Sequence, residues 1–220
     1  KLFAELEAVA PLNAVLASNS SGFPISAIAH GLATAQRMLG LHFFMPAHLV
    51  PLVEVVLGER SDPALGTWLH AFMRGCGSVP VLVKKDKPGF LANRMQHALS
   101  REAFALIDEG IASPEDVDAA VRFGFGFRFL AAGPVLQRDH AGIEVHTAAA
   151  ATMYPTLSNT DVPAQALRDK VAQGTLGMKT GKGFFDWPDD RKQAERARYD
   201  ALLRQGLALP YECRNGGCGL

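Results

Sequence analysis

The chain has no excess of charge of either sign. Its 220 residues include 22 Lys plus Arg and 22 Asp plus Glu, so the formal net charge at pH 7 is zero. A basic excess is the usual mark of a protein that binds nucleic acid or an anionic membrane, so neither partner is expected. The apolar runs are also too short to cross a bilayer.

Cysteine is scarce as well. The three cysteines, Cys76, Cys213 and Cys218, form no disulfide framework, which favours a reducing, cytoplasmic setting. Cys213 and Cys218 could pair or form half of a metal site, but no second ligand pair accompanies them, so we expect two loose tail residues. The histidines show no ligand spacing either, and no metal is predicted.

A third absence concerns the glycine-rich turn with which a dinucleotide-binding fold opens. No G-x-G-x-x-G occurs in the first 90 residues. The nearest glycine cluster, GFGF at Gly124–Phe127, follows a predicted helix and not a strand, so it does not satisfy the structural context of that turn.

The pattern of apolar residues divides the chain near 86–88. Before this point, strands and helices alternate, which predicts an α/β sheet with parallel character. The predicted strands cover 14–18, 38–44, 53–57 and 79–83, and the predicted helices cover 1–10, 25–32 and 62–74. After it, only helical patterns follow, at 90–109, 114–124, 135–153, 163–174 and 189–206. We therefore predict an α/β domain over 1–87, a helical domain over 88–190, and a charged helix and tail over 191–220.

The most informative segment is LGLHFFMPAHLVPLVE, Leu39–Glu54. It predicts a strand that ends near His42, a turn at Pro46, and a second apolar segment that delivers Glu54 twelve residues after the histidine. A carboxylate against an imidazole fixes the ring's tautomer and stabilises its protonated form, as a general base requires. Taken alone, such a histidine is more often a structural residue of the core or the surface.

Three further motifs accompany this pair: AVLASNSSG (Ala14–Gly22), KKDKPGFLANRMQ (Lys84–Gln96) and LGMKTGKGFFDW (Leu176–Trp187). In this order and at this spacing, the chain resembles the 3-hydroxyacyl-CoA dehydrogenase family over about residues 1–190, including the hydroxyacid branch to which lambda-crystallin belongs. The resemblance implies a partial Rossmann-type NAD-binding domain followed by an all-α 3-hydroxyacyl-CoA dehydrogenase-like C-terminal domain. The start of the family's nucleotide domain has no counterpart here, so we expect a fragment of a longer protein; a natural short form without the cofactor is the alternative.

The resemblance also implies roles for five residues. His42 would take the hydroxyl proton while hydride passes to NAD, and Glu54 would orient the ring. Ser21 would hydrogen-bond the reacting oxygen and, with Asn19, line the nicotinamide side of the site. Asn93 would donate to a substrate carbonyl, in a cleft between the two domains. The structural alternatives are a plain turn residue for Ser21 and a helix cap for Asn93.

One position departs from the family pattern. Met45 stands where relatives usually have an asparagine, three residues after the histidine, and a thioether cannot donate a hydrogen bond. The change could tune the pocket towards another substrate or weaken activity. In LGMKTGKGFFDW the predicted role is structural, with Gly181 and Gly183 in a tight turn and the aromatic residues packed against the helices.

Three hypotheses about function result. The first is an NAD-dependent oxidoreductase of fatty acid metabolism that oxidises a 3-hydroxyacyl-CoA, or reduces the 3-oxoacyl-CoA. The second is a dehydrogenase of a non-CoA hydroxyacid of the gulonate or carnitine type. The third is a non-catalytic dimerisation module. For the enzyme, the expected partners are a small-molecule substrate and a second copy of the chain, in a homodimer formed through the helical domain.

Overall fold

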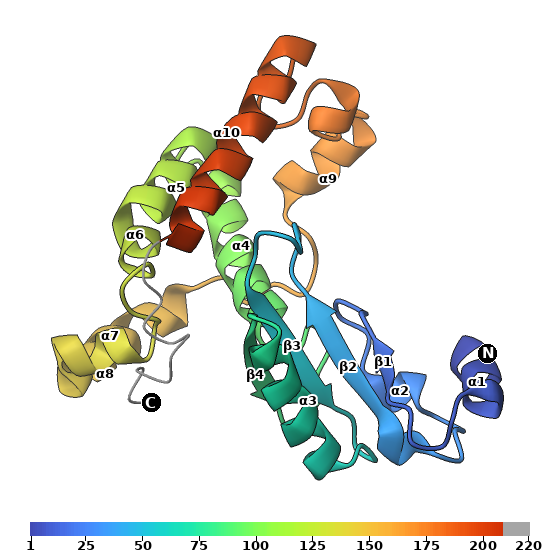
Figure 1. Ribbon diagram of the computed structural model, residues 1–220. Helices are drawn as coiled ribbons and strands as arrows, with labels where there is room; N and C mark the ends of the chain where they lie inside the picture. The colour runs from blue at the N-terminus through green and yellow to red at the C-terminus, as the bar shows by residue number, and fades with distance from the viewer. Residues whose placement is uncertain (209–220) are drawn as a thin grey trace. The chain divides into compact units, whose positions relative to one another are not determined.

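The computed structural model describes residues 1–208 (Figure 1). The described chain forms two compact units. Of the described residues, the first contains 1–96 and 193–208, and the second contains His97–Lys192.

The first unit contains a four-stranded sheet with short helices around it. Its strands are β1 (Leu16–Ser18), β2 (Met38–Phe43), β3 (Leu52–Leu57) and β4 (Val79–Val83). Its helices are α1 (Leu2–Val9), α2 (Ile25–Ile28), the 3₁₀ turn η1 (Ala35–Arg37) and α3 (Pro63–Gly75). Helix α3 begins as predicted, because the Asp62 carboxylate accepts from the Ala64 amide at 2.8 Å and Pro63 occupies the first turn.

The strands lie in the order β1-β2-β3-β4, and the sheet is mixed. The pairs β1–β2 and β3–β4 are parallel, as expected from the sequence, whereas β2 and β3 are antiparallel. The prediction of parallel character is therefore incomplete. A parallel connection needs a crossover of a dozen or more residues, and the segment between Phe43 and Leu52 is too short for one.

Alternation along β2 and β3 gives the sheet two different faces. Leu39, Val53, Val55 and Leu57 face a core that includes Leu69 of α3. The opposite face carries the other residues of the two strands, and its core consists of Leu16, Ile25, Ala29, Leu32, Ala35, Met38, Val56 and Phe90. His42 and Glu54 share the alternation of Met38 and Val56, so they belong to this second face.

Gly40 lies on the same face as His42, in the most crowded part of the sheet. A Cβ added to Gly40 would lie 2.9 Å from the Val56 Cβ and 3.0 Å from the Ile25 Cδ1. Glycine at this position therefore lets α2 approach the centre of the sheet.

A polar network attaches α1 to this sheet. The Glu7 carboxylate accepts from the Thr34 amide at 2.6 Å and from its hydroxyl, and the buried Arg37 guanidinium donates to the Glu7 backbone oxygen at 3.1 Å. The hydrogen bonds from Thr34 hold the pKa of the Glu7 carboxyl below its usual range. These hydrogen bonds and the packing of Phe3 against the core hold helix α1 in place.

The second unit is helical, and helix α4 (Ala92–Asp108) runs into it from the first unit. Further elements are α5 (Pro114–Ala120), the π turn η2 (Val121–Phe125), α6 (Gly126–Arg128), α7 (Leu136–Ala141), α8 (Ile143–Met153), η3 (Tyr154–Thr156), α9 (Gln165–Ala172), η4 (Met178–Thr180) and the start of α10 (Asp189–Ala208). The region predicted as one helix over 135–153 is two helices, because Gly142 has a φ of 93°. The helix predicted to end at Gly124 continues irregularly to Arg128.

Carboxylates of α4 tie later segments of the second unit together. The Asp108 carboxylate accepts from the backbone amides of Gln165 and Ala166 at 2.7 and 2.8 Å, which satisfies the first turn of α9. Phe184, from the LGMKTGKGFFDW motif, stacks on Phe104 of α4 with ring centroids 5.5 Å apart. The motif therefore packs on α4, in the structural role that its sequence predicts.

The turn within this motif needs glycine at more than one position. Gly181 has a φ of 80°, and a Cβ on Gly183 would lie 2.8 Å from the Gly177 Cα. Gly183 is therefore required for a close backbone approach, and Gly181 for a left-handed turn.

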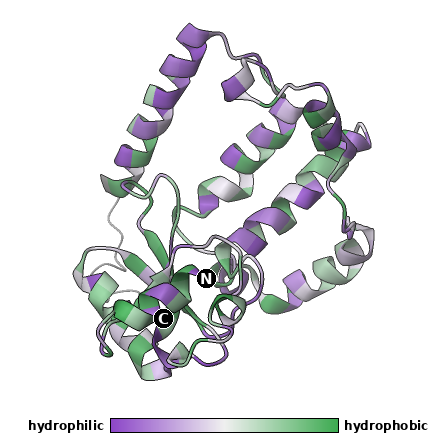
Figure 2. Cartoon of the chain, turned by 90° about the vertical axis from the view of Figure 1, so that its right-hand side faces the viewer, coloured by the Kyte–Doolittle hydropathy of each residue, from purple (hydrophilic) through white to green (hydrophobic). Residues whose placement is uncertain are grey.

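Many large apolar side chains of the second unit are exposed. Examples are Phe123 (74%), Val135 (79%) and Val171 (68%), whereas few residues of this unit are buried. Hydrophobic stretches recur along the helices in Figure 2. No helix in the described part of the chain is long and apolar enough to span a membrane. Cys76 is a free, exposed thiol, while Cys213 and Cys218 lie outside the described residues.

Candidate active site

His42 and Glu54 are cross-strand partners at the centre of the sheet. In the antiparallel register of β2 and β3, His42 lies directly opposite Glu54, two positions beyond the pair of Gly40 and Val56. Partners of this kind bring their side chains together on one face. The twelve residues that separate His42 from Glu54 in the sequence are thus the separation of two cross-strand partners in a β-hairpin.

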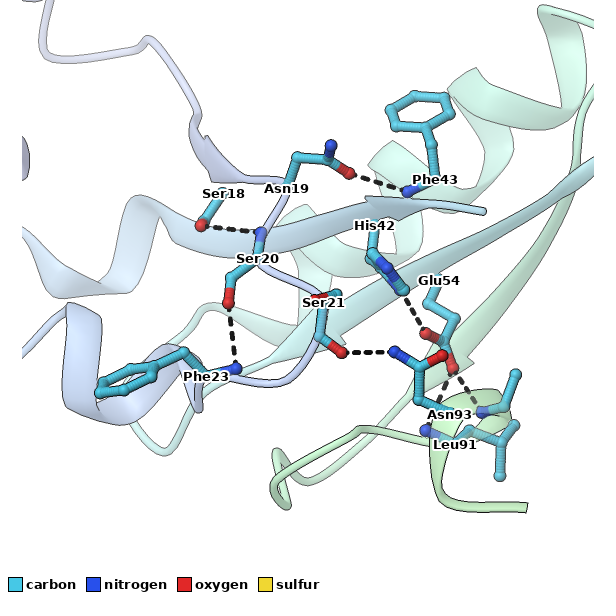
Figure 3. A network of polar contacts seen from close by, with 11 residues as sticks. Ser18, Asn19, Ser20, Ser21, Phe23, His42, Phe43, Glu54, Leu91 and Asn93 are labelled. Carbon is cyan, nitrogen blue, oxygen red and sulfur yellow. Dashed lines mark hydrogen bonds and ion pairs between the residues drawn. The ribbon is translucent and has the colours of Figure 1, made fainter. Parts of the chain in front are cut away.

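The two side chains form a buried hydrogen bond. His42 Nδ1 lies 2.8 Å from Glu54 Oε2, and the side chains are 6% and 0% exposed (Figure 3). An ionised carboxylate can only accept hydrogen bonds, so the ring proton belongs on Nδ1 and the lone pair on Nε2 is left to accept a proton. This is the arrangement that a histidine base requires.

The second oxygen of Glu54 binds the start of α4. Glu54 Oε1 accepts from the backbone amides of Leu91 and Ala92 at 3.1 and 2.9 Å (Figure 3). The amides at a helix N-terminus have no partner within the helix, and the helix dipole there favours a negative charge. Glu54 therefore accepts three hydrogen bonds with two oxygens, and its charge is compensated although it is fully buried.

Sequence reasoning missed this contact. The signal that could have indicated it is an absence: no Ser, Thr or Asp stands just before α4, so its first amides need an acceptor from elsewhere. The predicted start of this helix at residue 90 is correspondingly early, because Phe90 has a left-handed backbone and α4 begins at Ala92.

Two phenylalanines contact the imidazole. The ring centroid of Phe44 lies 4.7 Å from that of His42, and Phe90 meets the same ring edge-on at 5.9 Å. Phe44 comes from the strand exit and Phe90 from the turn before α4. Neither residue was among the predicted site residues, since an aromatic side chain beside an apolar strand usually indicates core.

The polar turn after β1 contains two more predicted residues, Asn19 and Ser21. Asn19 Oδ1 accepts from the Phe43 amide at 2.9 Å, so this side chain attaches the turn to the end of β2. The Asn19 amide nitrogen and the Ser21 hydroxyl have no hydrogen-bond partner within residues 1–208. Both residues are exposed, which leaves these donors available to a ligand.

Asn93 contacts the same turn, through the backbone of Ser21. Its Nδ2 donates to the Ser21 carbonyl oxygen at 2.6 Å, and the Gly89 amide donates to the Gly22 carbonyl oxygen at 3.2 Å. An amide nitrogen carries two hydrogens, so one donor of Asn93 remains. Asn93 is not simply a cap of its own helix, because its side chain joins the start of α4 to the turn after β1.

All five predicted site residues lie in the first unit, and hydrogen bonds link four of them in two pairs, while the fifth, Asn19, binds a neighbouring strand residue (Figure 3). His42 binds Glu54, Asn93 binds the Ser21 backbone, and Asn19 binds the Phe43 backbone. Their chemical roles remain predictions. Met45, the position that departs from the family pattern, is 80% exposed. Within the described chain, no group of three or more His, Cys, Asp or Glu could hold a metal ion.

Comparison with known families assigns both parts of the chain. Residues 1–87 match the 3-hydroxyacyl-CoA dehydrogenase NAD binding domain, and residues 89–187 match the 3-hydroxyacyl-CoA dehydrogenase C-terminal domain. Both parts of the chain therefore match one class of protein, the dehydrogenases that have an NAD-binding domain. The chain belongs to the 3-hydroxyacyl-CoA dehydrogenase family, which confirms the predicted resemblance, the fold class and NAD as the cofactor.

Two individual relatives are similar to most of this chain. The chain is 36% identical to the 5-formyl-3-hydroxy-2-methylpyridine 4-carboxylate 5-dehydrogenase of Mesorhizobium japonicum, over 88% of this chain and 63% of that one. It is also 36% identical to the L-carnitine dehydrogenase of Nocardiopsis dassonvillei, over 82% of this chain and 57% of the relative.

A solved structure is similar over nearly the whole chain. The crystal structure of a 5-formyl-3-hydroxy-2-methylpyridine 4-carboxylic acid 5-dehydrogenase, described as an NAD⁺-dependent dismutase, has a TM-score of 0.89 and 31% identity. The match covers 98% of this chain and 68% of that one. The chain thus spans about two thirds or less of the length of the relatives named here.

Proposed function

We propose that this chain is the catalytic portion of an NAD-dependent dehydrogenase acting on a hydroxyl group, or on the corresponding carbonyl, of a free carboxylic acid. The observation that carries the proposal is the buried His42–Glu54 pair, because a fully buried carboxylate against a histidine is the arrangement of a proton acceptor. The two relatives named above act, by their names, on a pyridine carboxylate and on carnitine. They favour the non-CoA alternative over the predicted CoA thioester.

The polar turn after β1 fits the nicotinamide end of NAD. It lies at the carboxyl ends of the parallel strands β1 and β2, which is where α/β sheets bind dinucleotides. The unpartnered Asn19 amide and Ser21 hydroxyl would hold this end of the cofactor. When bound, NAD⁺ supplies the acceptor for the hydride that leaves the carbon bearing the hydroxyl.

The proton transfer that accompanies hydride transfer is carried out by residues of the protein. His42 Nε2 takes the hydroxyl proton, and the Glu54 carboxylate at Nδ1 stabilises the resulting imidazolium. In the reverse direction the same nitrogen returns the proton to the carbonyl oxygen. The free hydrogen of Asn93 Nδ2 and the Ser21 hydroxyl would stabilise the charge that develops on this oxygen.

The test compares substrates and a base variant in one series. NADH formation or consumption is measured for the protein that contains this chain, with carnitine, gulonate, the hydroxymethyl and formyl pyridine carboxylates, and acetoacetyl-CoA. Turnover of a free acid that falls by about 10²–10⁴-fold in His42→Gln supports the proposal. A clear preference for the thioester would overturn the substrate class, and equal turnover in His42→Gln would overturn the role of the histidine.

We also propose that two copies of the chain associate through the helical unit. The support is the number of exposed large apolar side chains in 97–192, since a monomer rarely leaves this much apolar surface in water. Light scattering at micromolar concentration tests it. A monomeric mass that stays constant as the concentration rises would contradict it.

A further inference from the structure

Phe90 has an unusual backbone. Its φ is 49°, and among the described residues it is the only non-glycine with a positive φ. Bulky side chains rarely adopt this left-handed region, and such strain is retained where the surrounding structure holds it, often at functional sites. Phe90 is also 4% exposed, so its side chain is fully enclosed.

The backbone of Phe90 directs the start of α4 towards Glu54. Gly89 and Phe90 are left-handed in succession, with φ values of 79° and 49°, and α4 begins two residues after Phe90. This turn brings the next two amides, of Leu91 and Ala92, onto Glu54 Oε1. A right-handed Phe90 would send the same amides in another direction, and the buried oxygen would lose both donors.

The ring of Phe90 contacts His42, the other member of the His42–Glu54 pair. It packs in the core that includes Val56 and meets the His42 ring edge-on, at 5.9 Å and an interplanar angle of 62°. A glycine would adopt the same backbone without strain but would leave this side of the imidazole open. Position 90 therefore requires both a left-handed backbone and a large apolar side chain.

We propose that Phe90 is a positioning residue for the His42 base. Its backbone fixes one oxygen of Glu54 on α4, so that only the other oxygen is left for His42 Nδ1, and its ring limits the rotation of the imidazole. Together these contacts hold the proton on Nδ1 and keep Nε2 free. The inference rests on the proposed role of His42 as the proton acceptor, but it concerns a residue that acts through its contacts with His42 and through the amides on Glu54.

The tautomer of His42 gives a direct test. With ¹⁵N-labelled histidine, nitrogen chemical shifts of a neutral imidazole show which ring nitrogen carries the proton, and His42→Gln identifies the His42 signals. Two variants remove the aromatic ring in different ways: Phe90→Leu keeps an apolar side chain with most of the volume, and Phe90→Gly keeps the left-handed backbone but has no side chain. Leu32→Ala is the matched control, because Leu32 belongs to the same core.

In the wild type we expect the proton on Nδ1. Phe90→Leu should give a mixture of tautomers, Phe90→Gly a larger share of the Nε2-protonated form, and Leu32→Ala the wild-type pattern. In turnover assays the Phe90 variants should lose on the order of 10- to 100-fold in kcat with little change in KM. A wild-type tautomer in a folded Phe90→Leu protein overturns the inference, and this variant also decides the case if Phe90→Gly does not fold.

The same experiment distinguishes the inference from the proposed function. If the wild-type protein itself carries the proton on Nε2 of His42, the proposed base is wrong. If the wild type carries it on Nδ1 and the Phe90 variants do so equally, only the role of Phe90 is wrong. A change of tautomer in Leu32→Ala as large as in Phe90→Leu would show that general loosening of the core is responsible, and would also overturn the inference.

Discussion

Replacing Glu54 by glutamine separates the proposed catalytic role of this side chain from its role in folding. Glu54 is fully buried and accepts three hydrogen bonds, two from the amides of Leu91 and Ala92 and one from His42. Glutamine has the same shape, but one of its two polar groups is a donor. The substitution therefore leaves the volume unchanged and alters the pattern of donors and acceptors.

The amide of the variant has one favourable orientation. Its oxygen must face Leu91 and Ala92, because the opposite orientation would place two backbone donors against an NH₂ group. The NH₂ group then points at His42 Nδ1, which must accept, so the ring proton moves to Nε2. In that tautomer the nitrogen that should receive the substrate's proton already carries one.

The expected effects of Glu54→Gln on stability and on kcat differ greatly in size. Loss of the negative charge at the N-terminus of α4 lowers the free energy of unfolding by about 1–2 kcal/mol, since the remaining hydrogen bonds persist and a buried charge is removed. In serine proteases, a carboxylate-to-amide change that leaves a histidine in the wrong tautomer lowers kcat by about 10⁴-fold. We therefore expect Glu54→Gln to lose roughly 10³–10⁴-fold in kcat with only a modest loss of stability.

The assay measures kcat with the substrate identified by the substrate comparison, alongside urea unfolding of both proteins. Glu54→Asp is the matched control, because it keeps the charge but shortens the reach to His42 and to α4. A folded Glu54→Gln protein with kcat within tenfold of wild type would refute the reasoning. So would a variant that loses activity only because it unfolds.

Three further predictions concern stability. Gly40→Ala should destabilise the fold by about 1–3 kcal/mol in urea unfolding, because the added methyl group meets the neighbouring strand and α2 at about 3 Å; an unchanged midpoint would contradict this. Phe90→Gly should be more stable than Phe90→Ala by about 1 kcal/mol, since both lose the ring but only alanine is strained at a φ of 49°; equal midpoints would argue against the strain. The Glu7 carboxyl has a folded-state pKa below its ordinary value of 4.5, so its contribution is present above the unfolded-state pKa and is lost as pH falls through the folded-state pKa. Glu7→Gln should therefore reduce the acid-induced fall in Tm between about pH 5 and pH 3, and curves that stay parallel to wild type would refute this.

Much of the fold could be predicted from local patterns. Apolar patterns located all four strands, and the starts of α3 and α5 lie within a residue of the predicted ones, where Asp62 and Ser113 accept from the first turn. The antiparallel step between β2 and β3 was not predicted, because strand direction depends on the length of the connection and not on the composition of the strands. The break at Gly142 was missed because an apolar pattern can continue through two helices.

The candidate site was predictable only in part. His42 and Glu54 could be paired because both lie in apolar strands and because the family resemblance marks them. The third partner is the pair of backbone amides of Leu91 and Ala92, which begin thirty-seven residues after Glu54 and belong to apolar residues, so no side-chain pattern joins them to Glu54. The left-handed conformation of Phe90 likewise follows from tertiary packing, since local preference would assign it to glycine or asparagine.

The contact between Glu54 and α4 has a consequence for synthesis of the chain on the ribosome. A nascent chain that has emerged only as far as β4 contains both His42 and Glu54, but Oε1 lacks the two amide donors of Leu91 and Ala92. Burying this carboxylate without its donors is unfavourable, so Glu54 can reach its fully buried state only after the turn at Phe90 and the first residues of α4 have emerged. The hydrogen-bonded His42–Glu54 pair is therefore completed by a segment that is synthesised after the sheet which carries it.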